Sequence, residues 1–239
     1  DNTEYYVGQI IGERWGYETA GIFQTEDEVA NWADQSYVGA NWRPGDIKYA
    51  DLNNDGKIDK GNNTLDDRGD LKIIGYEAPR YNFGINGNVG YKAFTLSVFF
   101  QGILKYDYWV PNGNWNAFYP YNAGHVENYF LTETWSPDNP DAYFAAPHIS
   151  TNTKQNIEPQ SRYVQDASYI RLKNLTFAYN LPAELSNKIG LVNASIYFAG
   201  MNLWEATNMH KPLDPEVRPT ATQEYYKQRT YSLGLNVTF

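Results

Sequence analysis

Residues 230–239, the last ten of the chain, read Thr-Tyr-Ser-Leu-Gly-Leu-Asn-Val-Thr-Phe. Every second residue from Tyr231 to Phe239 is apolar, and the residues between them are small or polar. Successive side chains of a strand point to opposite faces, so this pattern predicts a strand with one apolar and one polar face. At about 3.3 Å per residue, the stretch also matches a tilted strand that crosses a bilayer. Taken alone, it fits an amphipathic strand of a soluble sandwich equally well.

The composition narrows the classes of protein that fit. The chain has 239 residues, a net charge of −9, no cysteine and an aromatic content of 16%. The acidic balance argues against nucleic acid as a partner, because phosphates attract a basic surface. No apolar run is long enough for a membrane helix, but a β-barrel spans a membrane without one. Aromatic residues at this density are typical of barrel girdles, sugar-binding surfaces and large interfaces.

Residues 80–106 predict a tight hairpin. Apolar residues alternate with Asn, Gly, Thr and Ser on both sides of Lys92-Ala93. A two-residue link of this kind pairs Tyr91 with Phe94 on the apolar face. The polar face is almost uncharged, which is unusual for a soluble sandwich and typical of a water-filled barrel lumen.

The remaining strand and helix signals are local. Residues 163–182 predict a long strand whose apolar phase shifts between Leu172 and Leu175, which indicates a bulge near Lys173-Asn174. Residues 193–202 predict the strand that follows. A short helix is expected after Thr25, because Thr25 and Glu28 occupy the N-cap and capping-box positions.

Residues 44–75 contain the sharpest local motif, Asp-Leu-Asn-Asn-Asp-Gly-Lys-Ile-Asp at 51–59. It matches the front of an EF-hand-type loop, in which oxygens at positions 1, 3 and 5 converge on a calcium ion. Position 12 departs from the motif, because Asn62 replaces the bidentate glutamate. We therefore predict a calcium-type loop at 44–75, stapled by a structural ion. The candidate ligands are Asp51, Asn53, Asp55, Lys57 through its backbone carbonyl, Asp59 and Asp66, with Asp67 as a further acid that could close the shell. The alternative is a surface turn whose side chains cap their own backbone.

Residues 105–162 are dense in Tyr, Trp, Asn and Pro, and they predict one long aromatic extracellular loop or a small lid. Such rings could bind sugars or peptides, which leaves the substrate open. The candidates for substrate contact are Tyr108, Trp109, Trp115, Tyr119 and Tyr121. The alternative is that these rings pack the loop against itself or against a partner.

Several stretches together resemble one known family. In order, they are 51–59, 69–75, 79–84, 96–102, 169–175, 202–203, 214–216 and the final Phe239. Each is weak alone, but the ordered set resembles the C-terminal part of the SusC/RagA-type TonB-dependent outer-membrane transporters of the Bacteroidetes. The matches run from about residue 44 to residue 239 and cover most of the chain.

The resemblance implies an all-β fold. Residues 1–239 would form the C-terminal portion of a large antiparallel transmembrane β-barrel of about 22 strands with long extracellular loops. The chain would supply about seven to eight of these strands. The plug and the TonB box of the family have no counterpart in the chain, so we expect it to be a piece of a longer protein.

The resemblance also implies a function. This is import of oligosaccharides or peptides across the bacterial cell outer membrane, with a SusD-like surface lipoprotein as a lid and with TonB as the energy source. The implied partners are the remainder of the barrel and plug, the lipoprotein, TonB, the substrate and the lipid bilayer, and no nucleic acid. No bond chemistry is involved, so we do not expect an enzyme.

Two other functions compete with this one. A secreted, calcium-stapled β-sandwich that binds glycans would fold in buffer without detergent, whereas a barrel segment has open sheet edges that lipid does not tolerate. A glycoside hydrolase is disfavoured, because pairs such as Asp138 and Asp141 show no spacing that singles out an acid and a nucleophile. The membrane interpretation requires hydrocarbon against a set of apolar side chains: Phe83, Ile85, Leu96, Val98, Leu233 and Leu235.

Overall fold

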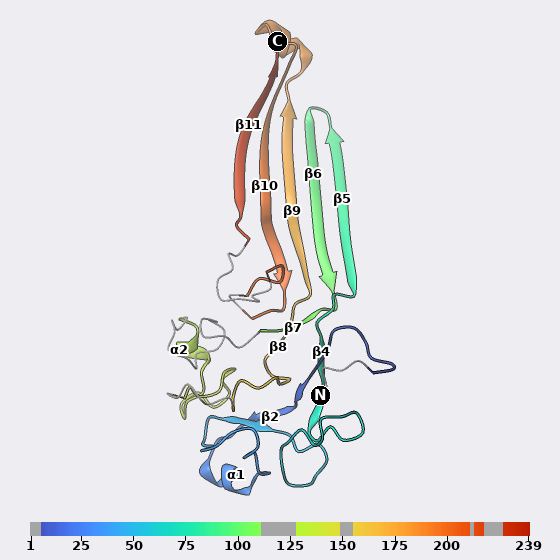
Figure 1. Cartoon of the computed structure of the whole chain (residues 1–239). Helices are drawn as coiled ribbons and strands as arrows, with labels where there is room; N and C mark the ends of the chain where they lie inside the picture. Colours follow the sequence, from blue (N-terminus) through green and yellow to red (C-terminus); the bar gives the residue numbers. More distant parts are fainter. Residues whose placement is uncertain (1–5, 111–127, 149–154, 211–212, 218–226) are drawn as a thin grey trace. The chain divides into compact units, whose positions relative to one another are not determined.

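The computed structural model of the chain describes residues 6–110, 128–148, 155–210, 213–217 and 227–239. The chain divides into two compact units, which we describe separately (Figure 1). The first unit comprises residues 1–78, 107–165 and 219–224, and the second comprises 79–106, 166–218 and 225–239. Within the described ranges, none of the helices has the length and apolar character needed to cross a membrane.

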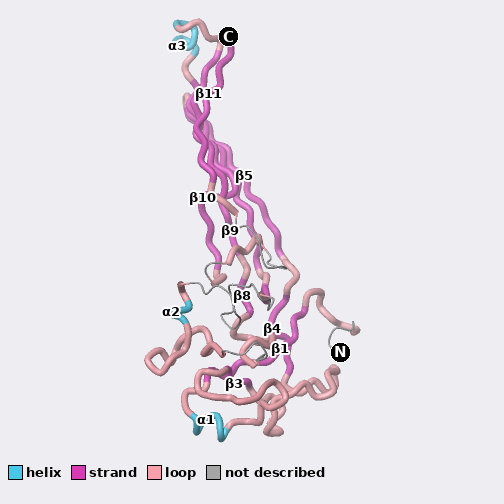
Figure 2. Tube along the Cα trace, turned by 60° about the vertical axis from the view of Figure 1, so that its left-hand side comes forward, coloured by secondary structure: helices cyan, strands magenta, loops and turns pink. Residues whose placement is uncertain are grey.

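The second unit is built on one antiparallel sheet with the strand order β11-β10-β9-β6-β5 (Figure 1). The strands are β5 (Tyr81–Tyr91), β6 (Phe94–Leu104), β9 (Tyr169–Asn180), β10 (Asn193–Thr207) and β11 (Thr230–Thr238). The predicted hairpin is confirmed, since Tyr91 lies opposite Phe94 across Lys92-Ala93. Helix α3 (Ala183–Lys188) lies in the connection between β9 and β10, near the end of β11 (Figure 2).

The strand register places apolar side chains in rows that run across the whole sheet. One such row consists of Val89, Leu96, Phe177, Phe198 and Leu233, each directly opposite the next. The outer members of this row are open to the surroundings, with Val89 62% and Leu233 81% exposed. A continuous apolar face of this extent requires an apolar environment or a partner.

The six side chains expected to face hydrocarbon all lie on this apolar face. Ile85, Leu96, Leu233 and Leu235 are exposed. Phe83 and Val98 are half-buried. The apolar face is therefore not sealed inside a globule formed by the described residues.

The opposite face of the sheet carries small and polar side chains in the same register. The row next to the apolar one consists of Asn88, Ser97, Thr176, Ala199 and Ser232. This alternation between faces confirms the pattern read from residues 80–106 and 230–239.

The predicted bulge in β9 is confirmed. Phe99 pairs with Asn174 and Phe100 pairs with Leu172, so Lys173 has no opposite residue in β6. The extra residue restores the phase of the strand, because Leu172 and Leu175 then point to the same face. Strand β10 shifts register at the same place, between Met201 and Trp204.

In the part of the chain that the structure describes, the first unit consists of short strands, two short helices and long connections. Strand β1 (Glu13–Tyr17) pairs with β4 (Leu71–Tyr76), β2 (Thr19–Ile22) pairs with β3 (Ile47–Tyr49), and β7 (Asp107–Trp109) pairs with β8 (Val164–Asp166). Its helices are α1 (Glu26–Asn31) and α2 (Phe130–Glu133). The expected total of about seven to eight barrel strands stays a prediction. Five long strands share one sheet, and the other strands of the described residues have three to six residues each.

The start of α1 is capped by Thr25 as predicted, whereas Glu28 reaches the N–H of the residue before Thr25 and not that of Thr25 itself. The hydroxyl of Thr25 accepts a hydrogen bond from the Glu28 N–H at 3.2 Å. The Glu28 carboxylate in turn accepts one from the Gln24 N–H at 3.0 Å. Both contacts use N–H groups that have no partner within the helix.

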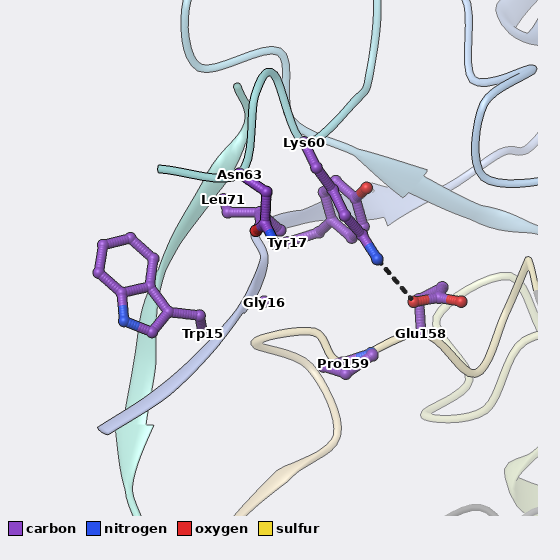
Figure 3. A pocket seen from close by; sticks show the side chains of 8 residues that line it. All are labelled: Trp15, Gly16, Tyr17, Lys60, Asn63, Leu71, Glu158 and Pro159. Atoms are coloured by element: carbon purple, nitrogen blue, oxygen red, sulfur yellow. Dashed lines mark ion pairs between the residues drawn. The ribbon is translucent and has the colours of Figure 1, made fainter. Parts of the chain in front are cut away.

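The core of the first unit joins residues that are far apart in sequence. Its fully buried aromatic side chains are Tyr17, Phe23, Tyr49, Phe144 and Tyr163. The rings of Tyr17 and Tyr49 lie 5.0 Å apart, and those of Phe144 and Tyr163 lie 5.7 Å apart. The Tyr49 hydroxyl donates to the Gln155 carbonyl at 2.6 Å, and the Tyr17 N–H donates to the Pro159 carbonyl at 2.8 Å (Figure 3). Segments before residue 50 and after residue 140 therefore belong to one folded unit.

Candidate functional site

A cluster of five charged side chains lies on the polar side of the sheet in the second unit. Arg171 of β9 is directly opposite Glu205 of β10, and the two form an ion pair. Arg171 Nη2 lies 2.7 Å from Asp214 Oδ1, and Arg171 Nη1 lies 3.0 Å from Glu216 Oε2. Lys173, the bulge residue, lies 2.8 Å from Glu216 through its Nζ atom. We call these residues the Arg171 cluster.

Within the Arg171 cluster, Arg171, Asp214 and Glu216 are largely buried, whereas Glu205 and Lys173 are partly exposed. The charges of the five nearly balance. The side chain of Arg171 is only 3% exposed. Two cations face three carboxylates, which leaves one net negative charge. Buried charges are tolerated only when they are paired, so the cluster fixes residues 213–217 against the sheet. Asp214 adds to this by accepting hydrogen bonds from the N–H groups of Glu216 (2.9 Å) and Lys227 (3.2 Å).

In the 44–75 segment, carboxylates accept hydrogen bonds from the surrounding backbone. Asp51 accepts from the N–H groups of Asn54 at 2.7 Å and Gly56 at 2.8 Å. Asp55 accepts from the N–H of Lys57 at 2.8 Å. Gly56 has a φ of +82°, in the left-handed region that glycine adopts without strain.

The structure places the predicted metal ligands in one segment without forming a metal cage. Asn53 donates to Asp55 at 3.0 Å, Asp59 caps the Gly61 N–H at 2.7 Å, and Asp66 is exposed. Among the described residues, no group of three or more His, Cys, Asp or Glu side chains could hold a metal ion. The observed contacts are those of a turn that caps its own backbone, and the calcium ion stays a prediction.

Asp70, which the motif does not include, is the buried acid of this segment. Its two oxygens accept from the N–H groups of Leu52 at 2.7 Å and Asp59 at 2.9 Å. Burial raises the pKa of the Asp70 carboxyl above its ordinary value, although the hydrogen bonds from the backbone oppose this shift. Asp70 therefore holds Leu52 and Asp59 at the start of β4, and we call residues 51–70 the acidic loop.

The aromatic candidates for substrate contact fall into two groups. Tyr108 and Trp109 of β7 are buried, with 7% and 5% exposure. Trp115, Tyr119 and Tyr121 lie outside the described residues. The burial of Tyr108 and Trp109 fits the alternative in which the rings pack the segment itself.

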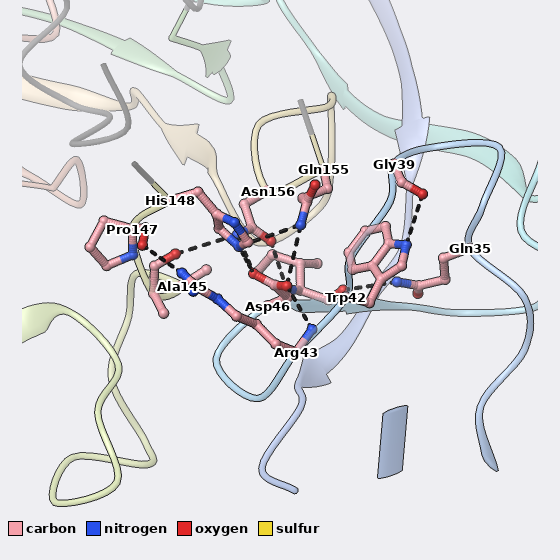
Figure 4. A network of polar contacts seen from close by, with 12 residues as sticks. Gln35, Gly39, Trp42, Arg43, Asp46, Ala145, Pro147, His148, Gln155 and Asn156 are labelled. Carbon is pink, nitrogen blue, oxygen red and sulfur yellow. Dashed lines mark hydrogen bonds and ion pairs between the residues drawn. The ribbon is translucent and has the colours of Figure 1, made fainter. Parts of the chain in front are cut away.

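A polar network around Asp46 holds two distant parts of the first unit together (Figure 4). The fully buried Asp46 carboxylate lies 2.5 Å from His148 Nε2 and accepts from Asn156 Nδ2 at 2.8 Å. It also accepts from Gln155 Nε2 at 3.3 Å and from the Arg43 N–H at 3.0 Å. The sequence gives no signal for this network, because its two halves are more than 100 residues apart.

In the Arg171 cluster, around Asp70 and around Asp46, polar side chains anchor connecting segments. The Arg171 cluster holds 213–217, Asp70 holds the acidic loop, and Asp46 holds 146–148 and 155–156. Such anchoring keeps loop surfaces in a fixed shape, as recognition of a ligand or a partner requires.

Comparison with known proteins agrees with this architecture. No family model matches the chain. TonB-dependent receptor P3 of Formosa agariphila is 30% identical over 97% of this chain, and TonB-dependent receptor P26 of the same organism is 29% identical over 100% of it. The resemblance to TonB-dependent receptors is confirmed. The chain spans only 22% and 24% of the length of these two relatives.

Solved structures of the RagAB peptide transporter, which is of the SusC/RagA type, share the fold. One superposes with a TM-score of 0.59 at 20% identity, and the importer in its open-open state with 0.57 at 19% identity. Each match covers 95% of this chain and 22% to 23% of the solved chain. The predicted fold class is confirmed, because the sheet of the second unit corresponds to part of an antiparallel transporter barrel. The names of these relatives are those of receptors and an importer, in line with the expectation that the chain is not an enzyme.

We predict that Arg171→Met loosens the segment after β10. The substitution removes the cation of Asp214 and one of the two cations of Glu216, and leaves Lys173 as the remaining one, at a cost of about 3–5 kcal/mol. Residues 213–217 should then exchange amide hydrogens faster in the full-length receptor in detergent. The triple variant Arg171→Met/Asp214→Asn/Glu216→Gln should recover most of the protection, and Lys188→Met, at an exposed lysine, should leave it unchanged. Equal exchange in all four proteins would contradict a role for the cluster in anchoring.

We predict that Asp70→Asn frees the acidic loop from β4. The amide keeps one acceptor oxygen and turns an NH₂ group toward a backbone N–H, so one hydrogen bond is lost at about 1–3 kcal/mol. Amide exchange at Leu52 or Asp59 should accelerate. Asp66→Asn changes an exposed carboxylate in the same loop and is the matched control. Unchanged exchange in the Asp70 variant would show that its carboxylate does not anchor the loop.

The calcium prediction is tested by limited proteolysis. If an ion is bound, calcium should protect residues 46–75 from protease, and Asp51→Ala with Asp55→Ala should abolish that protection. Equal cleavage of the unmutated chain with calcium and with a chelator would reject the ion and leave the self-capping turn.

Proposed function

We propose that this chain is part of an outer-membrane active transporter that imports oligosaccharides or peptides. The observation that carries the proposal is the two-faced antiparallel sheet, whose apolar rows are exposed while its opposite face is polar. The similarity to TonB-dependent receptors and to the RagAB barrel supports it. Because the chain spans about a quarter of its relatives, the transport activity belongs to the longer protein.

The apolar face is proposed to lie against lipid. The five long strands have 9 to 15 residues, and about 9–11 residues are needed for a tilted strand to cross the hydrocarbon core. Strands of a barrel satisfy their backbone hydrogen bonds with one another, so the open edges at β5 and β11 call for further strands. These strands would come from the remainder of the barrel.

The lengths of the connections between the strands indicate which end of the sheet faces the periplasm and which faces the cell exterior. At one end lie the two-residue turn at Lys92-Ala93 and the short connection that contains α3. At the other end, residues 105–168 and 208–229 leave the sheet as long segments. Outer-membrane barrels have short periplasmic turns and long extracellular loops, so we assign the second end to the cell exterior.

The polar face, with the Arg171 cluster, would then line the lumen. In this proposal a plug from the longer protein fills the lumen, TonB supplies the energy, and a SusD-like lipoprotein covers the exterior. Loop and lumen groups bind the substrate, and a movement of the plug releases it. RagAB is named a peptide importer, and the resemblance adds oligosaccharides as the second class.

A secreted, calcium-stapled sandwich that binds glycans is the second candidate. It requires the apolar rows to be covered within a soluble globule, whereas they are exposed in the described residues. The chain's behaviour in detergent-free buffer separates the two proposals, because a barrel segment aggregates there and a sandwich does not.

Import is tested by uptake in cells that produce the full-length receptor. Deletion of the receptor should abolish uptake of a labelled oligosaccharide or peptide mixture, and removal of TonB should have the same effect. Uptake that is unaffected by either deletion would reject the transport proposal.

We predict that a charge is tolerated on one face of β11 and not on the other. Leu233→Lys puts an ammonium group against lipid, which costs about 2–4 kcal/mol near the bilayer midplane. Ser232→Lys is the matched control, because the neighbouring residue faces the polar side. The fraction of receptor folded in lipid vesicles, followed by heat-dependent mobility on gels, should fall for Leu233→Lys only. Equal losses for the two variants would contradict the assignment of the faces.

A further inference from the structure

The apolar face of the sheet continues past the hairpin turn at Lys92-Ala93. The last row that crosses all five strands consists of Tyr91, Phe94, Tyr179, Ile196 and Leu235. Strands β10 and β11 run on beyond this row toward α3 (Figure 1). Because side chains alternate along a strand, Val237 is the next member of the apolar face, and Phe239 follows it in the same alternation.

Exposed apolar side chains gather at this end of the sheet, where α3 and the end of β11 lie (Figure 2). The Val192 N–H donates to the Thr238 carbonyl at 2.8 Å, so the segment after α3 meets the end of β11. The exposed side chains are Leu185 (48%), Ile189 (63%), Val192 (67%), Val237 (50%) and Phe239 (86%). We call them the α3 cluster. Contiguous exposed apolar side chains mark a surface that contacts a partner or a membrane.

Helix α3 presents two members of the cluster on one side. Leu185 and Ile189, the residue that caps the helix, are four positions apart and so share one side of it. Ser186 is fully buried, and its carbonyl accepts a hydrogen bond from the Leu191 N–H at 3.0 Å. The helix is therefore held to the segment before β10 through Ser186, while the side with Leu185 and Ile189 stays open.

Aromatic side chains mark two levels along the apolar face of the sheet. Tyr91 and Phe94 lie at the hairpin turn, and Tyr81 lies at the other end of β5, opposite Leu104. Strand β5 has 11 residues and so spans about 33 Å, which a tilt of about 40° reduces to about 25 Å across the bilayer. This is the height of the apolar band of an outer-membrane barrel, and aromatic girdles flank that band. The hydrocarbon core therefore fits between the level of Tyr81 and the level of Tyr91.

The α3 cluster lies beyond the girdle at the hairpin turn. Val237 and Phe239 are about 7 and 13 Å past Leu235 along β11, or about 5 and 10 Å across the bilayer. The headgroup layer is about 5–8 Å thick on each side of the hydrocarbon, and the apolar side of an interfacial helix is buried about 5–10 Å into the headgroup and acyl boundary. The depth of the cluster therefore matches the headgroup layer.

Exposed lysines lie near the same level. Lys92 is in the hairpin turn, and its Nζ atom lies 5.3 Å from the centre of the Tyr91 ring. Lys188 is in the last turn of α3, whose acidic residue is Glu184. Lysine side chains that extend from apolar surroundings toward lipid phosphates are typical of membrane interfaces.

We propose that α3 is a membrane-surface anchor, which lies in the headgroup layer of the periplasmic leaflet. Leu185 and Ile189 point toward the acyl chains, and Lys92 and Lys188 contact phosphate groups. Phospholipid is the occupant because the cluster is continuous with the apolar rows of the sheet and lies at the depth of the headgroups. The inference rests on the proposed function, which assigns this end of the sheet to the periplasm, and adds a lipid contact outside the strands that cross the hydrocarbon.

Spin labels on single cysteines test the position of the helix. The chain has no cysteine of its own, so Leu185→Cys, Ile189→Cys and Asn187→Cys each add one labelling site to it. The probe is the full-length receptor, with any cysteines elsewhere replaced, in vesicles of phosphatidylethanolamine and phosphatidylglycerol. Labels at 185 and 189 should collide mainly with oxygen, which concentrates in lipid. The label at 187, on the other side of the helix, is the matched control and should collide mainly with a water-soluble nickel chelate.

Each alternative arrangement gives a different result and overturns the proposal. Contact with the nickel chelate at all three positions would place α3 in water. Protection of 185 and 189 from both reagents would show that a protein, either a second copy of the receptor or a periplasmic partner, covers the cluster. Equal collision with oxygen at all three positions would place the whole helix in hydrocarbon.

Stability in the same vesicles is the second measurement. Leu185→Ser with Ile189→Ser should lower the equilibrium constant for folding about 10-fold or more, because two apolar side chains lose their contact with lipid. Asn187→Ser is the matched control and should leave the constant unchanged. Equal stability of the double variant and the parent would contradict the insertion of these side chains into lipid.

Uptake separates this inference from the function on which it rests. If deletion of the receptor abolishes uptake while the labels at 185 and 189 lie in water, the anchor is rejected and the transport proposal stands. If deletion leaves uptake intact while these labels lie in lipid, the transport proposal is rejected and the anchor stands.

Discussion

A slip of one residue in any of the five long strands would turn its apolar side chains to the polar face, because side chains alternate along a strand. The register is therefore the constraint on which the rest of the second unit depends. It aligns Val89, Leu96, Phe177, Phe198 and Leu233 in one row that crosses the whole sheet. A face of this kind gains free energy only where water is replaced by an apolar medium, which is why the strand pattern leads to a membrane.

The bulge at Lys173 connects this constraint to the charged cluster on the other face. Without the extra residue, the part of β9 after Asn174 would be out of phase with the part before Leu172. The inserted lysine joins Glu216 at 2.8 Å, next to Arg171. One irregularity thus keeps the apolar rows continuous and supplies a cation for the polar face.

Contacts that are local in sequence could be predicted, and contacts that are distant could not. The hairpin at Lys92-Ala93, the cap at Thr25 and the bulge at Lys173 depend on residues within a few positions of one another, where periodicity and turn chemistry are informative. Asp46 and His148 are 102 residues apart, and no spacing rule relates them. The same holds for Tyr17, whose N–H donates to the Pro159 carbonyl at 2.8 Å across more than 100 residues of sequence.

The 51–59 motif is local in sequence, yet it does not determine what the oxygens of the acidic loop contact. The pattern at 51–59 selects oxygens that could coordinate calcium, yet the same oxygens cap backbone N–H groups in the folded loop. Both uses need short Asp and Asn side chains and a left-handed glycine, so the sequence cannot separate them. Asp70, outside the motif, is the acid that joins the loop to the core.

The two units have different structural requirements, and this difference indicates which of them contacts a ligand or a partner. The sheet has to present a uniform apolar surface, so its composition follows a strict alternation that leaves little room for specific contacts. The first unit has no such surface to maintain, and polar networks around Asp46 and Asp70 hold its irregular backbone in place. Irregular segments on a rigid support are where binding residues gather. Contacts with a ligand or a partner are therefore expected in the connecting segments of the first unit, whereas the charged groups on the polar face of the sheet contact mainly one another.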